Sequence, residues 1–526
     1  MGKVMQGGQQ PIFIMQQGTT QEKGRVAQSN NIAAARAVAK AVQSTLGPMG
    51  MDKMLVDEGG DVIITNDGAT ILDEIDIDHP AAKMIIGVAK TQEQECYDGT
   101  TSAVILAGEL LKRSEDLIDQ NIHPTTICRG FRKAGAFILK ELPKYDIEEM
   151  DLIALAKTSL TGKSADSFKD ELAEICVNVV EKLATTNPPT VPNLEDINVV
   201  KAIGGSAGES LLMDSIILDK EKCHNGMPSR KDKPNILVLE SSLGVKQTEM
   251  DANIQITDPA QMEDFLAKEE AYLQGLANKI IESGADVVIC QREIDDLVKY
   301  HLATASIMAV EKVKKSDIDS LVSSTDALLL SNLDSLTKKD LGTCMKVEEK
   351  KIGEHMMIFV DYPKNGAVTL LLRGGTTHFV DEIERAFDDA VGVVSLAYRD
   401  MSVLTGGGSI YAALSYSLSQ FAHTIDGREK MAIDAFSRAL EVIPRTLADN
   451  AGLDPVNEMM LLSQHHANGE HWMGIDIENG GSIDMRHISV FEPRAVVEQA
   501  LKSALETAIM ILRIDDVISS KKAGQA

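Results

Sequence analysis

The chain has 526 residues, enough for about three domains of ordinary size. Hydrophobic residues make up 44% of it, charged residues 25% and aromatic residues only 4%, a composition typical of a soluble globular protein with aliphatic cores. Its net charge of −27 repels nucleic-acid phosphates and anionic lipids, and no apolar run is long enough to cross a membrane. We therefore expect neither nucleic acid nor membrane as a partner.

The cysteines and the N-terminal segment point to the cytoplasm. No two cysteines form a C-x-x-C pair, which argues against a disulfide framework and against a structural zinc site. The apolar run 12–15 is too short for a signal peptide, and Gln6 stands where a myristoylation signal needs Ser or Thr. The six cysteines are Cys96, Cys128, Cys176, Cys223, Cys290 and Cys344.

The first 150 residues or so have mainly helical patterns. An alanine-rich stretch over 31–45 predicts a helix that ends at Gly47-Pro48. A β-branched run over 61–65 predicts a strand that ends at the turn Asn66-Asp67-Gly68. From residue 101 to about 118, apolar side chains recur at helical spacing.

In the middle of the chain, strands and helices alternate strictly. Strands are expected over 236–239, 287–289, 307–310 and 327–330, with helices over 294–302 and 316–323. A longer helix follows the start signal Thr257-Asp258-Pro259 and ends at Gly284. Its apolar stripe consists of Met262, Phe265, Leu266, Leu273, Leu276 and Ile280. Such alternation predicts a parallel α/β sheet with right-handed crossovers.

After about residue 375, helical patterns return and continue to about residue 517, with an interruption at Gly406-Gly407-Gly408. The helix predicted over 380–397 has one apolar stripe, formed by Val380, Ile383, Phe387, Ala390, Val394 and Ala397. Two helix-rich ends therefore flank an α/β middle. The expected fold class is a multidomain α+β and α/β protein.

Several short motifs contain groups that can take part in chemistry, although each also has an ordinary structural reading. The segment 98–102 (Asp-Gly-Thr-Thr-Ser) opens into a helix, where N–H groups, hydroxyls and the helix dipole favour an anion and Asp98 can hold magnesium. Taken alone, it fits a helix cap better. Asp67 fits a tight turn, Asp389 fits a solvated helix face, and Gly406-Gly407-Gly408 fits either a close approach to a ligand or a flexible bend.

Two other segments partly match known motifs but lack residues that those motifs require. Gly162-Lys163-Ser164 is not a Walker A loop, because Lys157 stands where that motif needs glycine. His465, His466 and His471 lack the H-E-x-x-H spacing and a neighbouring cysteine, so we expect a surface loop there and no metal site.

Taken together, the motifs resemble one family in order along nearly the whole chain. They are Thr45-Leu46-Gly47-Pro48, then 50–55 (GMDKML), 65–72 (TNDGATIL), 98–102 (DGTTS), 372–376 (LRGGT), 381–386 (DEIERA), 450–455 (NAGLDP) and 511–517 (ILRIDDV), with a weaker match at 10–14 (QPIFI). This set is similar to that of the group II chaperonins, the archaeal thermosome type related to the eukaryotic cytosolic chaperonin.

The resemblance implies three domains. An equatorial ATP-binding domain would comprise residues 1–148 and 402–526, and a small α/β intermediate hinge domain would comprise residues 149–210 and 366–401. An α/β apical domain, residues 211–365, would bind the substrate. Its helical protrusion, about 243–265, would serve as a built-in lid, so no separate lid protein is implied.

The family's site residues carry over by motif, as implications of the resemblance. Thr45, Leu46, Gly47, Pro48, Gly99, Thr100, Thr101 and Ser102 would contact the phosphates of ATP or ADP. Asp98 would hold Mg²⁺, and Gly407, Gly408 and Glu492 would border the base and ribose. Asp67 and Asp389 would orient the attacking water from opposite domains, and Lys163 would sense the γ-phosphate.

The implied function is that of an ATP-dependent protein-folding chaperonin subunit. It would bind unfolded or partly folded proteins through the apical domain and enclose them in a cage driven by ATP hydrolysis. Its other partners would be identical or paralogous subunits in two stacked rings. Because the water-positioning carboxylates come from different domains, hydrolysis would depend on domain closure.

The chain departs from the family pattern at four positions. Tyr97 replaces a glycine before the phosphate loop, Met49 a lysine, Val26 an aspartate and Thr377 a glutamate. A bulky residue does not easily take positive φ, and Tyr97 would also crowd the phosphates. We therefore expect an ATPase that is slow or altered.

Two alternatives to an active folding machine stay open. One is a divergent structural subunit of a hetero-oligomeric ring that barely turns over, which Tyr97 and Met49 favour. The other is a free-standing small-molecule kinase or ligase, which predicts a monomer or small oligomer with a second substrate pocket.

Overall fold

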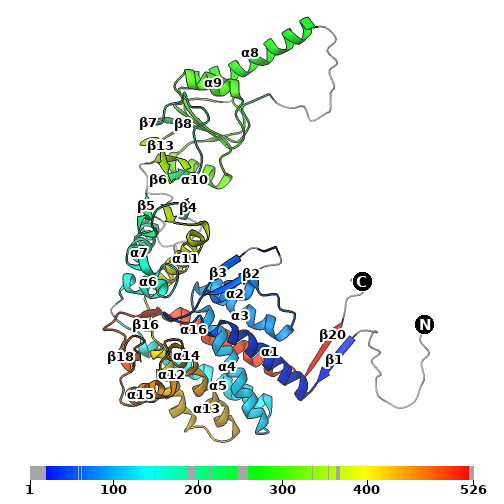
Figure 1. Ribbon diagram of the computed structural model, residues 1–526, viewed down its shortest axis with the longest axis vertical. Coiled ribbons are helices and arrows are strands. Elements are labelled where there is room, and N and C mark those ends of the chain that lie inside the picture. The colour runs from blue at the N-terminus through cyan, green and yellow to red at the C-terminus, as the bar shows by residue number, and fades with distance from the viewer. Residues whose placement is uncertain are drawn as a thin grey trace, which may run out of the picture. The chain divides into compact units, whose positions relative to one another are not determined.

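The computed structural model describes residues 19–56, 59–60, 62–148, 150–186, 197–213, 215–245, 259–334, 336–353, 355–362 and 368–520. The chain divides into two compact units, Met1–Thr158 with Asp400–Ala526, and Ser159–Arg399 (Figure 1). The expected mixture of helices and sheets is confirmed. A further division of the second unit into hinge and apical parts stays a prediction.

The first unit is built on helices from both ends of the chain. They are α1 (Arg25–Gln43), α2 (Gly68–Glu74), α3 (Pro80–Cys96), α4 (Thr100–Asp119), α5 (Pro124–Glu141), α12 (Ser409–Ala422), α13 (Arg428–Leu440), α14 (Val442–Asn450), α15 (Pro455–Ala467) and α16 (Arg494–Leu512). Helix α4 packs against α1, α3, α13 and α16 in an aliphatic core. The contact with α1 is close, because a Cβ on Gly108 would lie 2.4 Å from that of Ala39.

Short two-stranded sheets border these helices. Strand β1 (Thr19–Lys23) pairs with β20 (Asp516–Ser520), and β2 (Lys53–Val56) pairs with β3 (Val62–Thr65). The other two pairs are β16 (Val403–Thr405) with β19 (Phe491–Pro493) and β17 (Met473–Ile475) with β18 (Ser482–Asp484). The elements predicted over 31–45, 61–65 and 101–118 are confirmed as α1, β3 and α4, although α1 begins earlier than the alanine-rich stretch.

The second unit contains the predicted parallel sheet, with strand order β10-β9-β8-β11. The strands are β8 (Asn235–Leu239), β9 (Val287–Cys290), β10 (Met308–Val310) and β11 (Leu329–Leu330), and the short β12 (Gly342–Thr343) runs antiparallel to β8. Helices α8 (Pro259–Ser283), α9 (Asp296–Thr304) and α10 (Lys315–Thr325) alternate with them as expected. Ile236 and Val238 face one core, while Leu237 and Leu239 face another, so the sheet is buried on both faces.

Two further sheets and three helices complete this unit. The antiparallel sheet has the order β6 (Ser215–Leu218), β14 (His355–Asp361), β13 (Lys346–Ile352) and β7 (Arg230–Asp232). The other sheet has the order β4 (Ile197–Ile203), β15 (Val368–Gly374) and β5 (Leu211–Met213). The remaining helices are α6 (Leu152–Leu160), which begins in the first unit, α7 (Lys169–Thr186) and α11 (Thr377–Asp400).

The apolar stripe predicted for α8 is buried only in the second part of the helix. Leu273 and Ile280 are buried, but Phe265 and Leu266 are 47% and 51% exposed, because the first part of the helix extends beyond the core that covers its second part. The start signal at 257–258 and most of the proposed protrusion lie outside the described residues, as do the N-terminal match at 10–14 and the side chain of Met262.

The helices and cysteines of the described residues bear on the expected absence of membrane spans and disulfides. In that part of the chain, no helix combines the length and the apolar character that a membrane span needs. The six cysteines are all free thiols, and five of them are buried.

Candidate nucleotide site

The segment that begins α4 forms a tight loop with the groups an anion would need. Gly99 is the N-cap residue with φ 78°, and the Asp98 carboxylate accepts a hydrogen bond from the Gly99 N–H at 2.7 Å. A Cβ on Gly99 would lie 2.7 Å from Cγ1 of Val496, so both the backbone conformation and the available space require glycine. After Gly99, the N–H groups and the hydroxyls of 100–102 lie at the positive end of a 20-residue helix.

A buried amide that the sequence did not single out holds this loop in place. The Gln92 side chain is fully buried, and its Nε2 donates to the carbonyl oxygens of Asp98 at 2.8 Å and Val496 at 3.2 Å. Gln92 thereby ties α3, the loop and α16 together. Its position on the buried face of the helix over 80–96 is the only signal in the sequence that could have indicated this role.

The turn at Asp67 meets the α4 loop directly. Asp67 caps α2, and its Oδ2 accepts a hydrogen bond from the Thr70 N–H at 2.7 Å. The Thr100 hydroxyl donates to the other oxygen, Oδ1, at 3.4 Å. A Cβ on Gly68 would lie 2.5 Å from Oγ1 of Thr101, so the two turns are in close contact. Two of the carboxylates named by the resemblance, Asp67 and Asp98, therefore lie in adjoining turns.

The loop at 45–48 follows α1 and is held by α14. Thr45 is buried and donates its hydroxyl to the Val42 carbonyl at 2.9 Å, while Leu46 is partly buried and Pro48 is exposed. Gly47 has φ 83°, and a Cβ on it would lie 2.3 Å from Cδ2 of Leu447. The Asn450 amide donates to the carbonyls of Gln43 at 3.1 Å and Leu46 at 2.8 Å.

Gly407 and Gly408 follow strand β16, which pairs with β19. Gly407 and Gly408 have φ of 61° and 77° and precede α12. A Cβ on Gly407 would lie 2.4 Å from Sδ of Met485, and one on Gly408 would lie 2.7 Å from Cβ of Pro444. The glycine run is therefore a closely packed turn.

The negative charge of Asp98 contributes to the raised pKa values of Glu492 and Tyr411. Burial and, to a smaller extent, the negative charge of Asp98 raise the pKa of Glu492 to about 8. Burial, together with the charges of Glu492 and Asp98, also raises the pKa of the Tyr411 hydroxyl. Asp98, Glu492 and Tyr411 therefore interact electrostatically, and this cluster favours either a protonated Glu492 or a bound cation.

The remaining two predicted residues, Asp389 and Lys163, belong to the second unit. Asp389 lies on α11 and is only 9% exposed, and its Oδ2 forms an ion pair with Nζ of Lys163. The reading of Asp389 as part of a solvated helix face is wrong, because a lysine 226 residues away in sequence compensates its charge. Buried carboxylates are seldom retained without such a partner.

The four departures from the family pattern have different surroundings. Tyr97 adopts the left-handed conformation, with φ 61° and ψ −10°, and its N–H donates to the Glu93 carbonyl at 2.9 Å as the C-cap of α3. The bulky side chain therefore occupies the backbone conformation that favours glycine. Met49 and Val26 are 49% and 62% exposed, and Thr377 is the exposed first residue of α11.

The surface loop expected for the histidine cluster is wrong for His465 and His466, while His471 lies in the turn that follows α15. His465 and His466 lie in the last turn of α15, and His466 is 1% exposed with Nε2 at 3.0 Å from the Met473 carbonyl. Burial lowers the pKa of His466 to about 4, so it is a neutral core residue. Within the described ranges, no group of three or more His, Cys, Asp or Glu side chains is placed to hold a metal ion.

The helical unit made from both chain ends, the adjoining turns at 67–68 and 98–102 with the glycine loop at 45–48 after α1, and the inserted α/β unit define the chaperonin class of protein. The model of the TCP-1/cpn60 chaperonin family matches residues 38–522, and the chain belongs to this family as a group II chaperonin subunit.

Archaeal proteins are among the relatives of high identity. The chain is 50% identical to the thermosome subunit beta of Archaeoglobus fulgidus, with 97% of this chain and 95% of that one covered. It is 48% identical to the thermosome subunit of Methanopyrus kandleri and 46% identical to the thermosome subunit alpha of Thermoplasma acidophilum, with 99% and 96% covered in each case. The predicted family and its chaperonin function are confirmed.

Proposed function

We propose that this chaperonin subunit binds and hydrolyses Mg-ATP in the first unit and uses the cycle to enclose unfolded or partly folded proteins. The observation that carries the proposal is the meeting of two turns, one with Asp67 and the other with Asp98, at the start of α4. This arrangement offers N–H groups and hydroxyls to phosphate oxygens and carboxylates to a cation. Phosphoryl transfer depends mainly on such positioning and charge neutralisation.

The residues fit a magnesium ion that arrives with a nucleotide. Mg²⁺ binds through one or two carboxylates together with phosphate oxygens and water, so a site with Asp98 alone is sufficient once phosphates are present. Burial and, after it, the negative charge of Asp98 raise the pKa of Glu492, so Asp98 lies close enough to act on this carboxyl. When bound, magnesium would neutralise charge on the phosphates, and Asp98 would hold it.

Glu492 would act as a neutral group beside the ribose. With a pKa of about 8, its carboxyl is mostly protonated at neutral pH and can donate a hydrogen bond to a hydroxyl oxygen. The packed turn at 407–408 would border the base, as the motif resemblance implies, with its glycines fitting closely against Met485 and Pro444.

Hydrolysis would require residues of both units. Asp67 would orient the attacking water from its place beside Thr100, and Asp389 would do so from the second unit. Lys163 compensates the charge of Asp389 and would respond to the γ-phosphate, because a phosphate competes with Asp389 for its ammonium group. This division of the machinery would make turnover depend on closure of the units.

The two-stranded sheets of the first unit support assembly into stacked rings of identical or paralogous subunits. An isolated two-stranded sheet is marginal, and its open edges invite pairing with another chain. The pair β2–β3 and the segment just before it also expose large apolar side chains, whose exposed fractions run from 37% to 69%: Met51, Met54, Val56, Val62 and Ile64. A neighbouring subunit would cover this surface.

Unfolded clients would bind the second unit through its exposed apolar side chains. Phe265 and Leu266 on α8 are 47% and 51% exposed, and Tyr300 on α9 is 57% exposed. Exposed apolar surface of this kind is where non-native chains bind.

The nucleotide part of the proposal is tested by calorimetric titration of the purified full chain with Mg-ADP. We expect saturable binding that Asp98→Asn weakens strongly, while Asp73→Asn, an exposed carboxylate on α2, leaves it unchanged. Binding that is equal in both variants would remove Asp98 from the site.

A second candidate function is a ring subunit that binds nucleotide but barely hydrolyses it. The observation that favours it is Tyr97, which holds a left-handed conformation next to the phosphate loop. Turnover at the level of an Asp389 variant, in a chain that still binds Mg-ADP, would establish this function.

A further inference from the structure

A pocket with an unusual charge lies among the helices of the first unit. It has a volume of about 520 Å³, which is large enough for a small ligand. The walls come from α1, α4, α13 and α14, together with the first residue of α15. None of the residues assigned above to nucleotide binding lines it.

The charge of the pocket is opposite to that of the protein. The chain carries 52 basic and 79 acidic residues, yet six of the eight charged residues that line the pocket are basic. The two acidic residues are Glu109 and Asp449. The cations come from four different helices and are Arg36, Lys40, Lys112, Arg113, Arg438 and Arg445.

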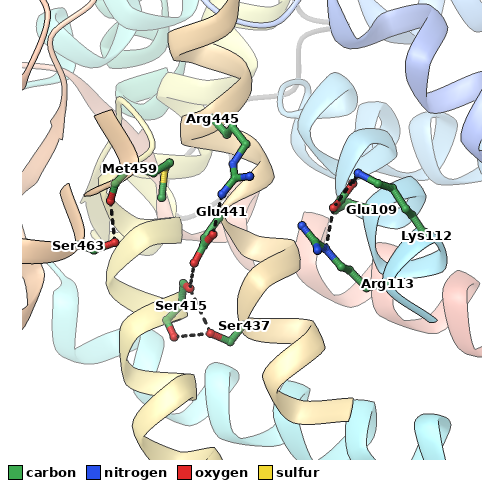
Figure 2. A network of polar contacts seen from close by, with 9 residues as sticks. All are labelled: Glu109, Lys112, Arg113, Ser415, Ser437, Glu441, Arg445, Met459 and Ser463. Carbon is green, nitrogen blue, oxygen red and sulfur yellow. Dashed lines mark hydrogen bonds and ion pairs between the residues drawn. The ribbon is translucent and has the colours of Figure 1, made fainter. Parts of the chain in front are cut away.

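Carboxylates neutralise only part of this positive charge. Glu109 is shared by two cations, with its oxygens 2.8 Å from Nζ of Lys112 and 2.8 Å from Nε of Arg113, as Figure 2 shows. Arg445 is paired with Glu441 at 3.0 Å, and Arg36 with Glu115 at 2.9 Å.

Two cations remain available to a ligand. In the part of the chain that the structure describes, neither Lys40 nor Arg438 forms an ion pair. A concave site that gathers uncompensated cations on low-dielectric helical walls concentrates positive potential and attracts anions.

We propose that this pocket binds a compact anion with several phosphate groups. Guanidinium groups and ammonium groups recognise phosphate oxygens by charge-assisted hydrogen bonds, and Arg36, Arg438 and Arg445 offer planar forks from three different helices. A single phosphate would reach few of these groups, whereas a chain or ring of phosphates can contact several helices at once.

Helix α14 connects the pocket to the nucleotide loops. Arg445 and Thr446 line the pocket, and the Thr446 hydroxyl accepts a hydrogen bond from Nε2 of Gln43 at 3.2 Å. The adjacent residues of α14 contact the other side, since Pro444 lies against Gly408 and Leu447 against Gly47. The network of Ser415, Ser437 and Glu441 also ties Arg445 to α12, whose N-cap residue is Gly408 (Figure 2).

A polyphosphate that contacts Arg445 would therefore change the position of the loops at 45–48 and 407–408. The pocket is thus a regulatory site for nucleotide affinity, and this second part of the inference rests on the proposed nucleotide site. The binding of the anion itself does not.

Binding is tested by titrating the full-length chain with inorganic tripolyphosphate in a buffer that contains EDTA and no nucleotide. The pocket variant is Lys40→Gln with Arg438→Gln, which removes two unpaired cations and leaves no buried carboxylate without its partner. The control is Lys83→Gln with Arg428→Gln, which removes the same charge from exposed positions on α3 and α13. Sodium chloride at equal ionic strength reports screening alone.

We expect the pocket variant to weaken tripolyphosphate binding by about tenfold or more per charge removed, as is typical for charge-assisted hydrogen bonds, and the control to leave it unchanged. Equal affinities in the two variants would overturn the proposal. So would complete displacement of tripolyphosphate by saturating ADP, because the anion would then occupy the phosphate loops.

Regulation is tested separately, by the affinity for ADP with and without tripolyphosphate at constant free Mg²⁺. We expect the affinity for ADP to change by about fivefold or more in the control variant and not at all in the pocket variant, because fivefold is the lower end of typical couplings between two sites. If ADP fails to bind at all, the proposed function fails while the anion site stands. If ADP binds equally with and without the anion, the coupling through α14 is refuted.

Discussion

The protonation of Glu492 gives a quantitative test of the candidate nucleotide site. With a pKa of about 8, this carboxyl is mostly neutral at pH 7 and mostly ionised at pH 9. The ionised form adds a negative charge next to Asp98 and near the expected position of the phosphates, so it disfavours the nucleotide. If only the protonated form binds, the apparent Kd for Mg-ADP rises about tenfold between pH 7 and pH 9.

The matched variant is Glu492→Gln, which keeps the shape of the protonated side chain and removes its titration. We expect its affinity at pH 7 to be close to that of the unmodified chain and to stay flat to pH 9, as calorimetry in buffers of equal ionic strength would show. Comparison of the two profiles cancels the titration of ADP itself. Parallel profiles, or tighter binding by the unmodified chain at high pH, would refute the reasoning.

Three other predictions concern backbone conformation and buried charge. Tyr97→Gly is expected to be more stable than Tyr97→Ala by about 1 kcal/mol in urea unfolding, because only alanine keeps the cost of the left-handed conformation. Gly99→Ala, with φ 78° and Val496 in its way, should destabilise the chain by roughly 1–3 kcal/mol and abolish Mg-ADP binding, measured by urea unfolding and calorimetry. Burial raises the pKa of Asp388 to about 6, and the negative charge of Glu384 contributes to this rise. Ionisation of Asp388 therefore reduces the stability of the folded chain as the pH rises from about 4 to about 6. Asp388→Asn should therefore raise stability by up to ~3 kcal/mol at pH 7 and lose this advantage below about pH 4 in urea unfolding.

Periodicity and turn signals in the sequence predicted most of the regular structure. The alternation over 236–330 gave the parallel sheet correctly, because strands buried on both faces are short apolar runs between turn residues. The same patterns could not show where a core ends. Phe265 and Leu266 continue the stripe of α8 yet remain exposed, since the apolar face extends further than the surface that covers it.

Local patterns were less informative about the site, because its geometry depends on contacts between distant segments. The sequence pattern around Asp389 is that of a surface helix face, but Lys163 lies beside it in the structure. Likewise, the Asn450 amide donates to the Leu46 carbonyl, which is 404 residues away in sequence. The motif resemblance named Asp67, Asp98 and the loops at 45–48 and 98–102. The fully buried Gln92 lies outside all of the motifs. The assigned roles of these residues, the three-domain boundaries, the lid and the cytoplasmic location stay predictions.

The most direct test of the central claim is phosphate release by the purified full chain with Mg-ATP. Asp389→Ala removes the proposed water-positioning carboxylate, and Asp388→Asn changes its neighbour on the same helix as a control. We predict clear turnover in the unmodified chain and in the control, and turnover lost in Asp389→Ala. Turnover in the unmodified chain that equals that of Asp389→Ala would contradict an ATP-hydrolysing chaperonin subunit and support the structural one.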